Sequence, residues 1–96
     1  MLVIITYDIS LNDKDGTKRL RKISKECINY GQRVQNSVYE CNVDAAELAK
    51  LRNKLLNIID LKNDSLRIYN LGNNYMNKIE HYGTKVSYDA EDVLLI

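Results

Sequence analysis

The sequence predicts a small α+β domain in which two helices alternate with the strands of one sheet. Three observations support this fold class. Residues 2–9 form an aliphatic stretch typical of a buried strand, two segments carry apolar residues at helical spacing, and the segments 32–43 and 65–71 have the pattern of strands. The chain has 96 residues, which is enough for one hydrophobic core and too few for two. We therefore expect a single domain over residues 1–96.

The first predicted strand, residues 2–9, has the sequence of a central strand. Residues 2–5 are all aliphatic and leave no polar face, as in a strand that is covered on both sides. The strand delivers a carboxylate, Asp8, at its far end, where a charge must be solvated, paired or bound to a metal. Its position fits two roles equally: a functional carboxylate at an open strand end, or the start of a turn that continues through Ser10.

Two helices follow from apolar spacing and from their end signals. The first is predicted from about residue 15 to residue 29, with Asp15 as N-cap and Gly31 as a left-handed C-cap residue. Its buried stripe consists of Leu20, Ile23, Cys27 and Tyr30. The second helix opens with Asp44-Ala-Ala-Glu47, which has the form of a capping box. Its inward residues are Leu48, Leu51, Leu55 and either Ile58 or Ile59.

The remaining strands give the topology. Segment 32–43 places Tyr39, Cys41 and Val43 on one face and Val34 and Val38 on the other, and the pattern leaves the number of strands in it open. Segment 65–71 is a further strand, tract 75–88 is weakly patterned, and residues 93–96 form a short apolar strand. The order strand, helix, strand, strand, helix, strand predicts a ferredoxin-like βαββαβ sandwich with an extra C-terminal strand.

The same topology predicts a homodimer. Right-handed crossovers place both helices on one face of the sheet, whereas the first strand is apolar on both faces. No third helix is available to cover the second face. A second copy packed sheet to sheet is the simplest cover.

Five cations lie within eight residues of the first helix, and no acidic residue interrupts them: Lys18, Arg19, Arg21, Lys22 and Lys25. They form either a phosphate-binding surface or an ordinary solvated helix face. Because the net charge is only +1, any attraction for nucleic acid must come from such a local patch. Arg33, Arg67, Lys78 and Lys85 are candidates to extend it. Ser37, in the polar segment 33–40, is a candidate hydrogen-bond donor to phosphate.

Several classes of protein are disfavoured. Cys27 and Cys41 have no CxxC spacing and no clustered histidine, so we expect reduced thiols rather than a zinc site. No apolar run reaches ~18 residues, and the first residues lack a signal-peptide pattern, so a cytoplasmic location without membrane contact is expected. His81 is a lone histidine, interpreted as a surface residue.

Four motifs in order resemble the CRISPR-associated protein 2 family, the small adaptation protein of CRISPR systems. They are Ile5-Thr-Tyr-Asp-Ile9, Thr17-Lys-Arg-Leu-Arg-Lys22, the segment from Tyr30 to Glu40, and the segment from Asp64 to Tyr75. The resemblance runs over essentially the whole chain. One departure is Tyr39, where many members have phenylalanine.

The resemblance implies a ferredoxin-like homodimer whose C-terminal extension, residues 75–96, crosses to the partner subunit. It implies a metal-dependent endonuclease that cleaves phosphodiester bonds in RNA or duplex DNA. Asp8 matches the family's metal-binding and catalytic aspartate, with Tyr7 as its supporting neighbour. The expected ion is Mg²⁺, with Mn²⁺ as a substitute. The nucleic-acid-binding residues would be Lys18, Arg19, Arg21, Lys22, Arg33 and Ser37.

In cells, the resemblance implies a role in spacer acquisition, in which the dimer bridges two dimers of the CRISPR-associated integrase. The main alternative is a toxin-type ribonuclease of related fold. An RNA-recognition module is disfavoured because the aromatic signature of its central strands is absent. A ligand-sensing regulator is disfavoured by the five cations of the first helix.

Overall fold

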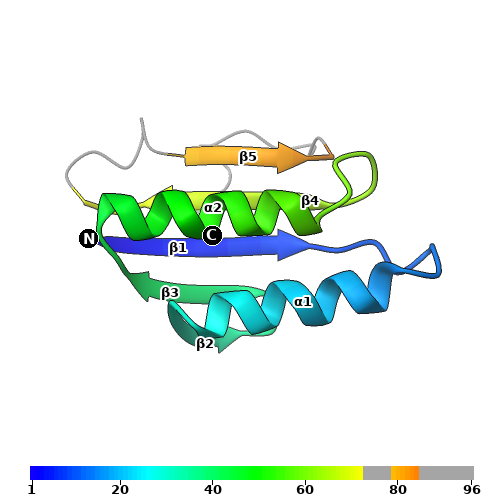
Figure 1. Ribbon diagram of the computed structural model, residues 1–96, viewed down its shortest axis with the longest axis horizontal. Helices are drawn as coiled ribbons and strands as arrows, with labels where there is room; N and C mark the ends of the chain where they lie inside the picture. The colour runs from blue at the N-terminus through cyan, green and yellow to red at the C-terminus, as the bar shows by residue number, and fades with distance from the viewer. Residues whose placement is uncertain (73–78, 85–96) are drawn as a thin grey trace.

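The computed structural model describes residues 1–72 and 79–84, and it confirms the α+β fold (Figure 1). Its elements are β1 (Leu2–Asp8), α1 (Gly16–Ile28), β2 (Gly31–Gln35), β3 (Val38–Asn42), α2 (Ala45–Ile58), β4 (Ser65–Asn70) and β5 (Ile79–Gly83). The strands form one sheet in the order β2-β3-β1-β4-β5, and every neighbouring pair is antiparallel. This is the predicted ferredoxin-like order with a fifth strand added beside β4.

Strand β1 lies in the centre of the sheet, as its aliphatic sequence predicts. Ile5 stands opposite Tyr39 of β3 on one side and Ile68 of β4 on the other. Side chains alternate between the faces of a strand, and accordingly Val3, Ile5 and Tyr7 are buried while the residues between them are not. Strand β1 therefore has one face in the core and one on the far side of the sheet.

Both helices cover the same face of the sheet, as expected from the crossover rule (Figure 1). Helix α1 contributes Ile23 and Cys27 to the core, with Leu20 and Tyr30 packed against it. Helix α2 contributes Leu48, Leu51 and Leu55, and Ile59 just beyond its end is buried while Ile58 is only partly so. The capping box is confirmed: the Glu47 N–H donates to Asp44 Oδ1 at 2.8 Å, and the Asp44 N–H donates to Glu47 Oε1 at 3.0 Å.

Of the two predicted caps of α1, the position of the N-cap is confirmed and the C-cap is wrong. Asp15 occupies the N-cap position, but its side chain makes no capping hydrogen bond. Its own backbone N–H donates instead to Asp13 Oδ1 at 2.9 Å. Gly31 is not a left-handed C-cap residue but the first residue of β2. A Cβ there would overlap the Glu40 carbonyl oxygen and Cys41 Sγ, so close packing against β3, rather than a turn, requires the glycine.

The structure settles the number of strands in one segment and adds a strand that the sequence pattern did not predict. Segment 32–43 is two antiparallel strands, β2 and β3, whose register shifts between Arg33 and Gln35. The weakly patterned tract contains β5, which pairs with β4 from Ser65 opposite Gly83 to Tyr69 opposite Ile79. The strand predicted at residues 93–96 and the proposed crossing of residues 75–96 fall mostly outside the described residues.

Candidate functional site

Asp8 lies at the end of the central strand, on the face of the sheet that the helices leave uncovered. Alternation along β1 puts Asp8 on the same side as Ile4 and Thr6, opposite to the buried Tyr7. The Asp8 side chain is exposed, and it stands opposite Ser65, the first residue of β4. Among the described residues, Asp8 has no ion-pair partner. A solvated, uncompensated carboxylate at a rigid strand end is available for a cation.

Tyr7, the predicted support for Asp8, points into the core instead. Its ring stacks on that of Tyr39, with centroids 6.2 Å apart, and burial is the main cause that raises the pKa of its hydroxyl. Tyr7 supports the strand end through packing, and through its backbone N–H, which donates to the Ser37 carbonyl oxygen at 3.2 Å. The predicted phosphate ligand Ser37 thus lies beside the end of β1.

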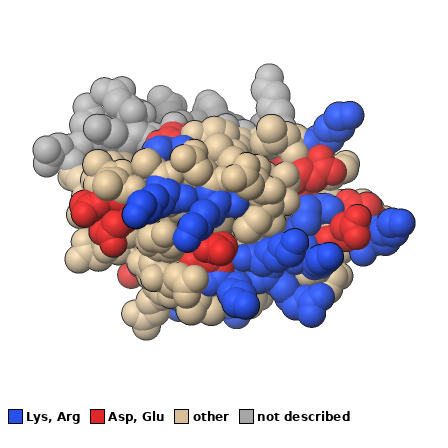
Figure 2. All heavy atoms as spheres, in the orientation of Figure 1, with Lys and Arg blue, Asp and Glu red and all other residues tan. Residues whose placement is uncertain are grey.

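Four of the five cations of α1 form a continuous surface, here called the basic surface: Lys18, Arg21, Lys22 and Lys25. All four are exposed, and among the residues that the structure describes none has an ion-pair partner. They line a hollow of about 320 Å³. Figure 2 shows lysine and arginine side chains gathered over α1 on this side of the molecule.

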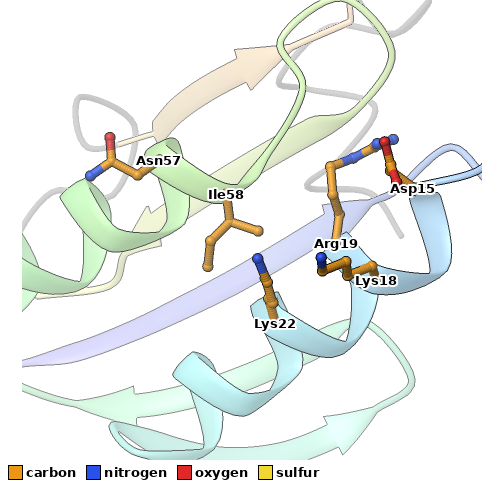
Figure 3. Close-up of a pocket in the computed structure, with 6 residues that line it drawn as sticks. All are labelled: Asp15, Lys18, Arg19, Lys22, Asn57 and Ile58. Carbon is orange, nitrogen blue, oxygen red and sulfur yellow. The ribbon is translucent and has the colours of Figure 1, made fainter.

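A second hollow, of about 350 Å³, adjoins the first between α1 and the end of α2 (Figure 3). Lys18 and Lys22, one helical turn apart, line both hollows. Asn57 and Ile58 of α2 line the second hollow on one side, and Arg19 of α1 and Asp15 just before this helix line it on the other. Lys18 and Lys22 are therefore central to the positive charge of this face.

Arg19 differs from its neighbours, because two carboxylates compensate its charge. Its guanidinium contacts Asp13 and the fully buried Asp64, each at 2.8 Å, and its side chain is only 13% exposed. The hydrogen bonds that Arg19 donates to both carboxylates raise its pKa, and the bond to Asp13 lowers the pKa of that carboxyl group. The expectation of five uncompensated cations is therefore wrong for Arg19, since its acidic partners lie outside the helix.

Arg33 extends from β2 towards α1. Its Nη2 donates to Ser24 Oγ at 2.6 Å and its Nε to Tyr39 Oη at 3.0 Å, and the guanidinium lies 5.5 Å from the Tyr39 ring centroid. The hydrogen bond to Tyr39 is the main cause that raises the pKa of Arg33. Arg33 therefore lies on the same side of the sheet as the basic surface. Arg67 lies on the opposite side, in register with Thr6, and Lys78 and Lys85 lie outside the described residues.

The sequence-predicted residues therefore fall into two groups on opposite faces of the sheet. The basic surface and Arg33 lie on the helix side, whereas Asp8 lies on the uncovered side. The sequence pattern did not predict that the two groups lie on opposite faces. It also gave no sign that Asp64 is a buried carboxylate, because its only local signal is its place in a turn. Within the described part of the chain, no group of three or more metal-ligating side chains is present, and no helix is long and apolar enough to cross a membrane.

Comparison with known proteins identifies the family. The family model for CRISPR associated protein Cas2 matches residues 1–79. The chain belongs to the Cas2 family. A CRISPR-associated endonuclease Cas2 from Halalkalibacterium halodurans is 59% identical over 95 residues, which are 99% of each chain. A CRISPR-associated endoribonuclease Cas2 from Chlorobaculum tepidum is 54% identical over 96 residues, the full length of both.

A solved Cas2 structure agrees with this fold. Crystals of Streptococcus pyogenes Cas2 at pH 6.5 gave a structure that matches this one with a TM-score of 0.70 and 49% sequence identity. The match covers 83% of this chain and 96% of the other. The names of the relatives, endonuclease and endoribonuclease, support a CRISPR-related nuclease role for this chain.

Proposed function

We propose that this Cas2-family chain is a metal-dependent endonuclease that cleaves phosphodiester bonds in RNA or duplex DNA. The observation that carries the proposal is Asp8, an exposed carboxylate that has no ion-pair partner among the described residues. It lies at the end of the central strand, on the face of the sheet that the helices do not cover. The endonuclease and endoribonuclease names of the relatives support the reaction class. The family match favours this role over a toxin-type ribonuclease of related fold.

The donor set around Asp8 fits a magnesium ion. Mg²⁺ is held in many enzymes by one or two carboxylates, with water and substrate phosphates as the other ligands. One protomer offers Asp8, and a second copy packed on this face would offer another. When bound there, Mg²⁺ or Mn²⁺ would polarise the phosphate and lower the pKa of a bound water. Asp8 fixes the position of that charge, because β1 is hydrogen-bonded on both sides.

The protein binds nucleic acid mainly through the basic surface. Lysine and arginine side chains on a helix contact phosphates without regard to sequence. Because the basic surface and Asp8 lie on opposite faces of the sheet, binding and cleavage depend on separate residues. Arg33 extends the binding side, and Ser37 lies beside the end of β1. Arg19 is left out of the interface because its charge is used within the fold.

We further propose that the chain works as a cytoplasmic homodimer in spacer acquisition and bridges dimers of the CRISPR integrase. The sheet face that neither helix covers, with Ile4 half-buried near its centre, supports sheet-to-sheet pairing. Such a dimer would bring two copies of Asp8 to one interface and leave both basic surfaces outside.

Substitution of Asp8 by asparagine tests the proposed activity. Asp8→Asn removes the charge that holds the ion, so cleavage should fall to the level of EDTA-treated wild type. Duplex binding should be unchanged, because the basic surface is intact. Cleavage of labelled RNA and duplex DNA is measured with Mg²⁺ and with Mn²⁺, and binding is measured separately by fluorescence anisotropy.

The control is Thr6→Ser, a substitution on the same face of the sheet two residues before Asp8. It changes this face but leaves Asp8 in place. Undiminished cleavage by purified Asp8→Asn protein would refute the assignment. Loss of binding together with cleavage would show that Asp8 supports the fold, and not the reaction alone.

A further inference from the structure

Asp64 is a fully buried carboxylate whose two oxygens accept four hydrogen bonds. Oδ1 accepts from the Ser10 N–H at 2.9 Å and from Arg19 Nη2 at 3.2 Å. Oδ2 accepts from the Asp60 N–H and from Arg19 Nε, each at 2.8 Å. A buried charge is stable only when it is paired and hydrogen-bonded in this way. Each oxygen therefore joins one backbone N–H to the guanidinium.

These contacts converge on the backbone around Asp8. Ser10 is the second residue after Asp8, and Ser65, which follows Asp64, stands opposite Asp8 in the sheet. The Asp64 carbonyl oxygen also accepts from the Thr84 N–H at 2.7 Å, at the end of β5. Gly83 has a φ of 106°, and a Cβ there would overlap that carbonyl group. Asp64 thus fixes the chain after Asp8 and the strand beside it.

Arg19 extends this arrangement to α1. Its Nη1 donates to Asp13 Oδ1 at 2.9 Å and its Nη2 to Asp13 Oδ2 at 2.8 Å, while Nη2 also lies 3.4 Å from the Ser10 carbonyl oxygen. The loop from β1 to α1 is therefore held at its start, through Ser10, and near its end, through Asp13. Lys18 adjoins Arg19 in the sequence, so the same residue connects the loop after Asp8 to the helix that carries the basic surface.

We infer that Asp64 and Arg19 are positioning residues that hold the Asp8 carboxylate in place for the proposed cleavage, an inference that rests on the proposed function. Neither residue reaches the substrate: Asp64 is enclosed, and Arg19 is occupied by two carboxylates. Their effect passes through the backbone at Ser10 and at Ser65. Residues that orient a metal-binding side chain in this way typically change metal affinity or activity by about 10–100-fold when they are replaced.

Asp64→Asn is the test variant because it keeps the shape of the side chain. All four partners of Asp64 are donors, and each oxygen accepts from a backbone N–H. Whichever oxygen becomes an NH₂ group therefore faces a backbone donor. The control is Leu48→Ala, a buried residue of α2 next to its start, which weakens the core without touching Asp64. Both proteins are assayed well below their melting temperatures.

The expected result is a split between kcat and KM. Asp64→Asn should lower kcat at least about tenfold and weaken Mn²⁺ binding by a similar factor, with KM for duplex DNA unchanged. Leu48→Ala should leave kcat and KM at their wild-type values. Unchanged kcat in folded Asp64→Asn protein, or an equal loss in Leu48→Ala, would overturn the inference. If Asp64→Asn does not fold, Arg19→Lys is the second test variant. It keeps the positive charge but loses the guanidinium that donates to Asp13 and Asp64 at once, and it must also lower kcat.

Amide hydrogen exchange separates this inference from the proposed function. If the wild type shows no metal-dependent cleavage, the proposed function fails. Faster exchange at residues 8–10 in Asp64→Asn, absent in Leu48→Ala, would still support the positioning of Asp8 by Asp64. Unchanged exchange there would overturn it.

Discussion

Replacement of two lysines gives the sharpest test of the basic surface. Lys18→Gln/Lys22→Gln removes the two cations that line both hollows and leaves Arg19 and its ion pairs in place. Each phosphate contact that a cation makes contributes about 0.9 to the slope of log K against log salt concentration for duplex DNA. Loss of two contacts should therefore reduce the magnitude of the slope by about 1.8.

This change in slope has a measurable size. Between about 50 and 200 mM salt the concentration rises fourfold, so a slope difference of 1.8 corresponds to a factor of about twelve in affinity. The wild type should lose about twelve times more affinity than the variant over this range. Anisotropy titrations of a labelled duplex at several salt concentrations give both slopes, and circular dichroism checks that the variant is folded.

A matched control separates local contacts from net charge. Lys50→Gln/Lys62→Gln removes the same charge from exposed positions on α2 and in the turn after it. If the basic surface binds phosphates, this control should keep nearly the wild-type slope. Equal slopes in wild type and Lys18→Gln/Lys22→Gln would show that α1 is only a solvated face. Equal flattening by the control would show that general charge, and not this surface, attracts DNA.

Two further predictions concern stability and assembly. Arg19 lowers the pKa of Asp13 in the folded protein below its ordinary value of 3.8. The ion pair therefore stabilises the fold fully above pH 3.8, and this contribution is lost as the pH falls through the folded-state pKa of Asp13. The melting temperature should therefore stay constant from neutral pH to about 5 and decrease below about pH 4. The decrease should be less steep in Asp13→Asn, and an identical decrease in this variant would contradict the prediction. Light scattering should give about twice the 11.1 kDa chain mass. Ile4→Asp on the uncovered sheet face, or deletion of residues 93–96, should shift the mass towards the monomer, and a monomeric wild type would refute sheet-to-sheet pairing.

Features with a local signal were predictable from the sequence. The capping box of Asp44 and Glu47 depends on residues three positions apart, and the structure contains both of its hydrogen bonds. The central position of β1 followed from its aliphatic residues, and the inward faces of both helices followed from their spacing.

Features that depend on distant residues were not predictable. Arg19 looked like its neighbours on α1, because its buried partner Asp64 lies 45 positions away. Strand β5 was missed because its support is also remote: it pairs with β4, and Arg52 on α2 binds Glu80 across 28 positions at 2.6 Å. Gly31 was assigned to a helix end, whereas the need for glycine there comes from β3 packed against it. In each case a tertiary contact outweighed the local pattern.

The central position of β1 also has a consequence for how the chain folds. Strand β1 pairs with β3 and β4, and both of these strands follow it in the sequence. Strand β1 therefore has both of its sheet neighbours only after β3 and β4 have docked. Contacts between such distant segments slow folding relative to helical proteins of this size. Until β4 docks, the exposed edge of β1 is a site for association with other unfinished chains.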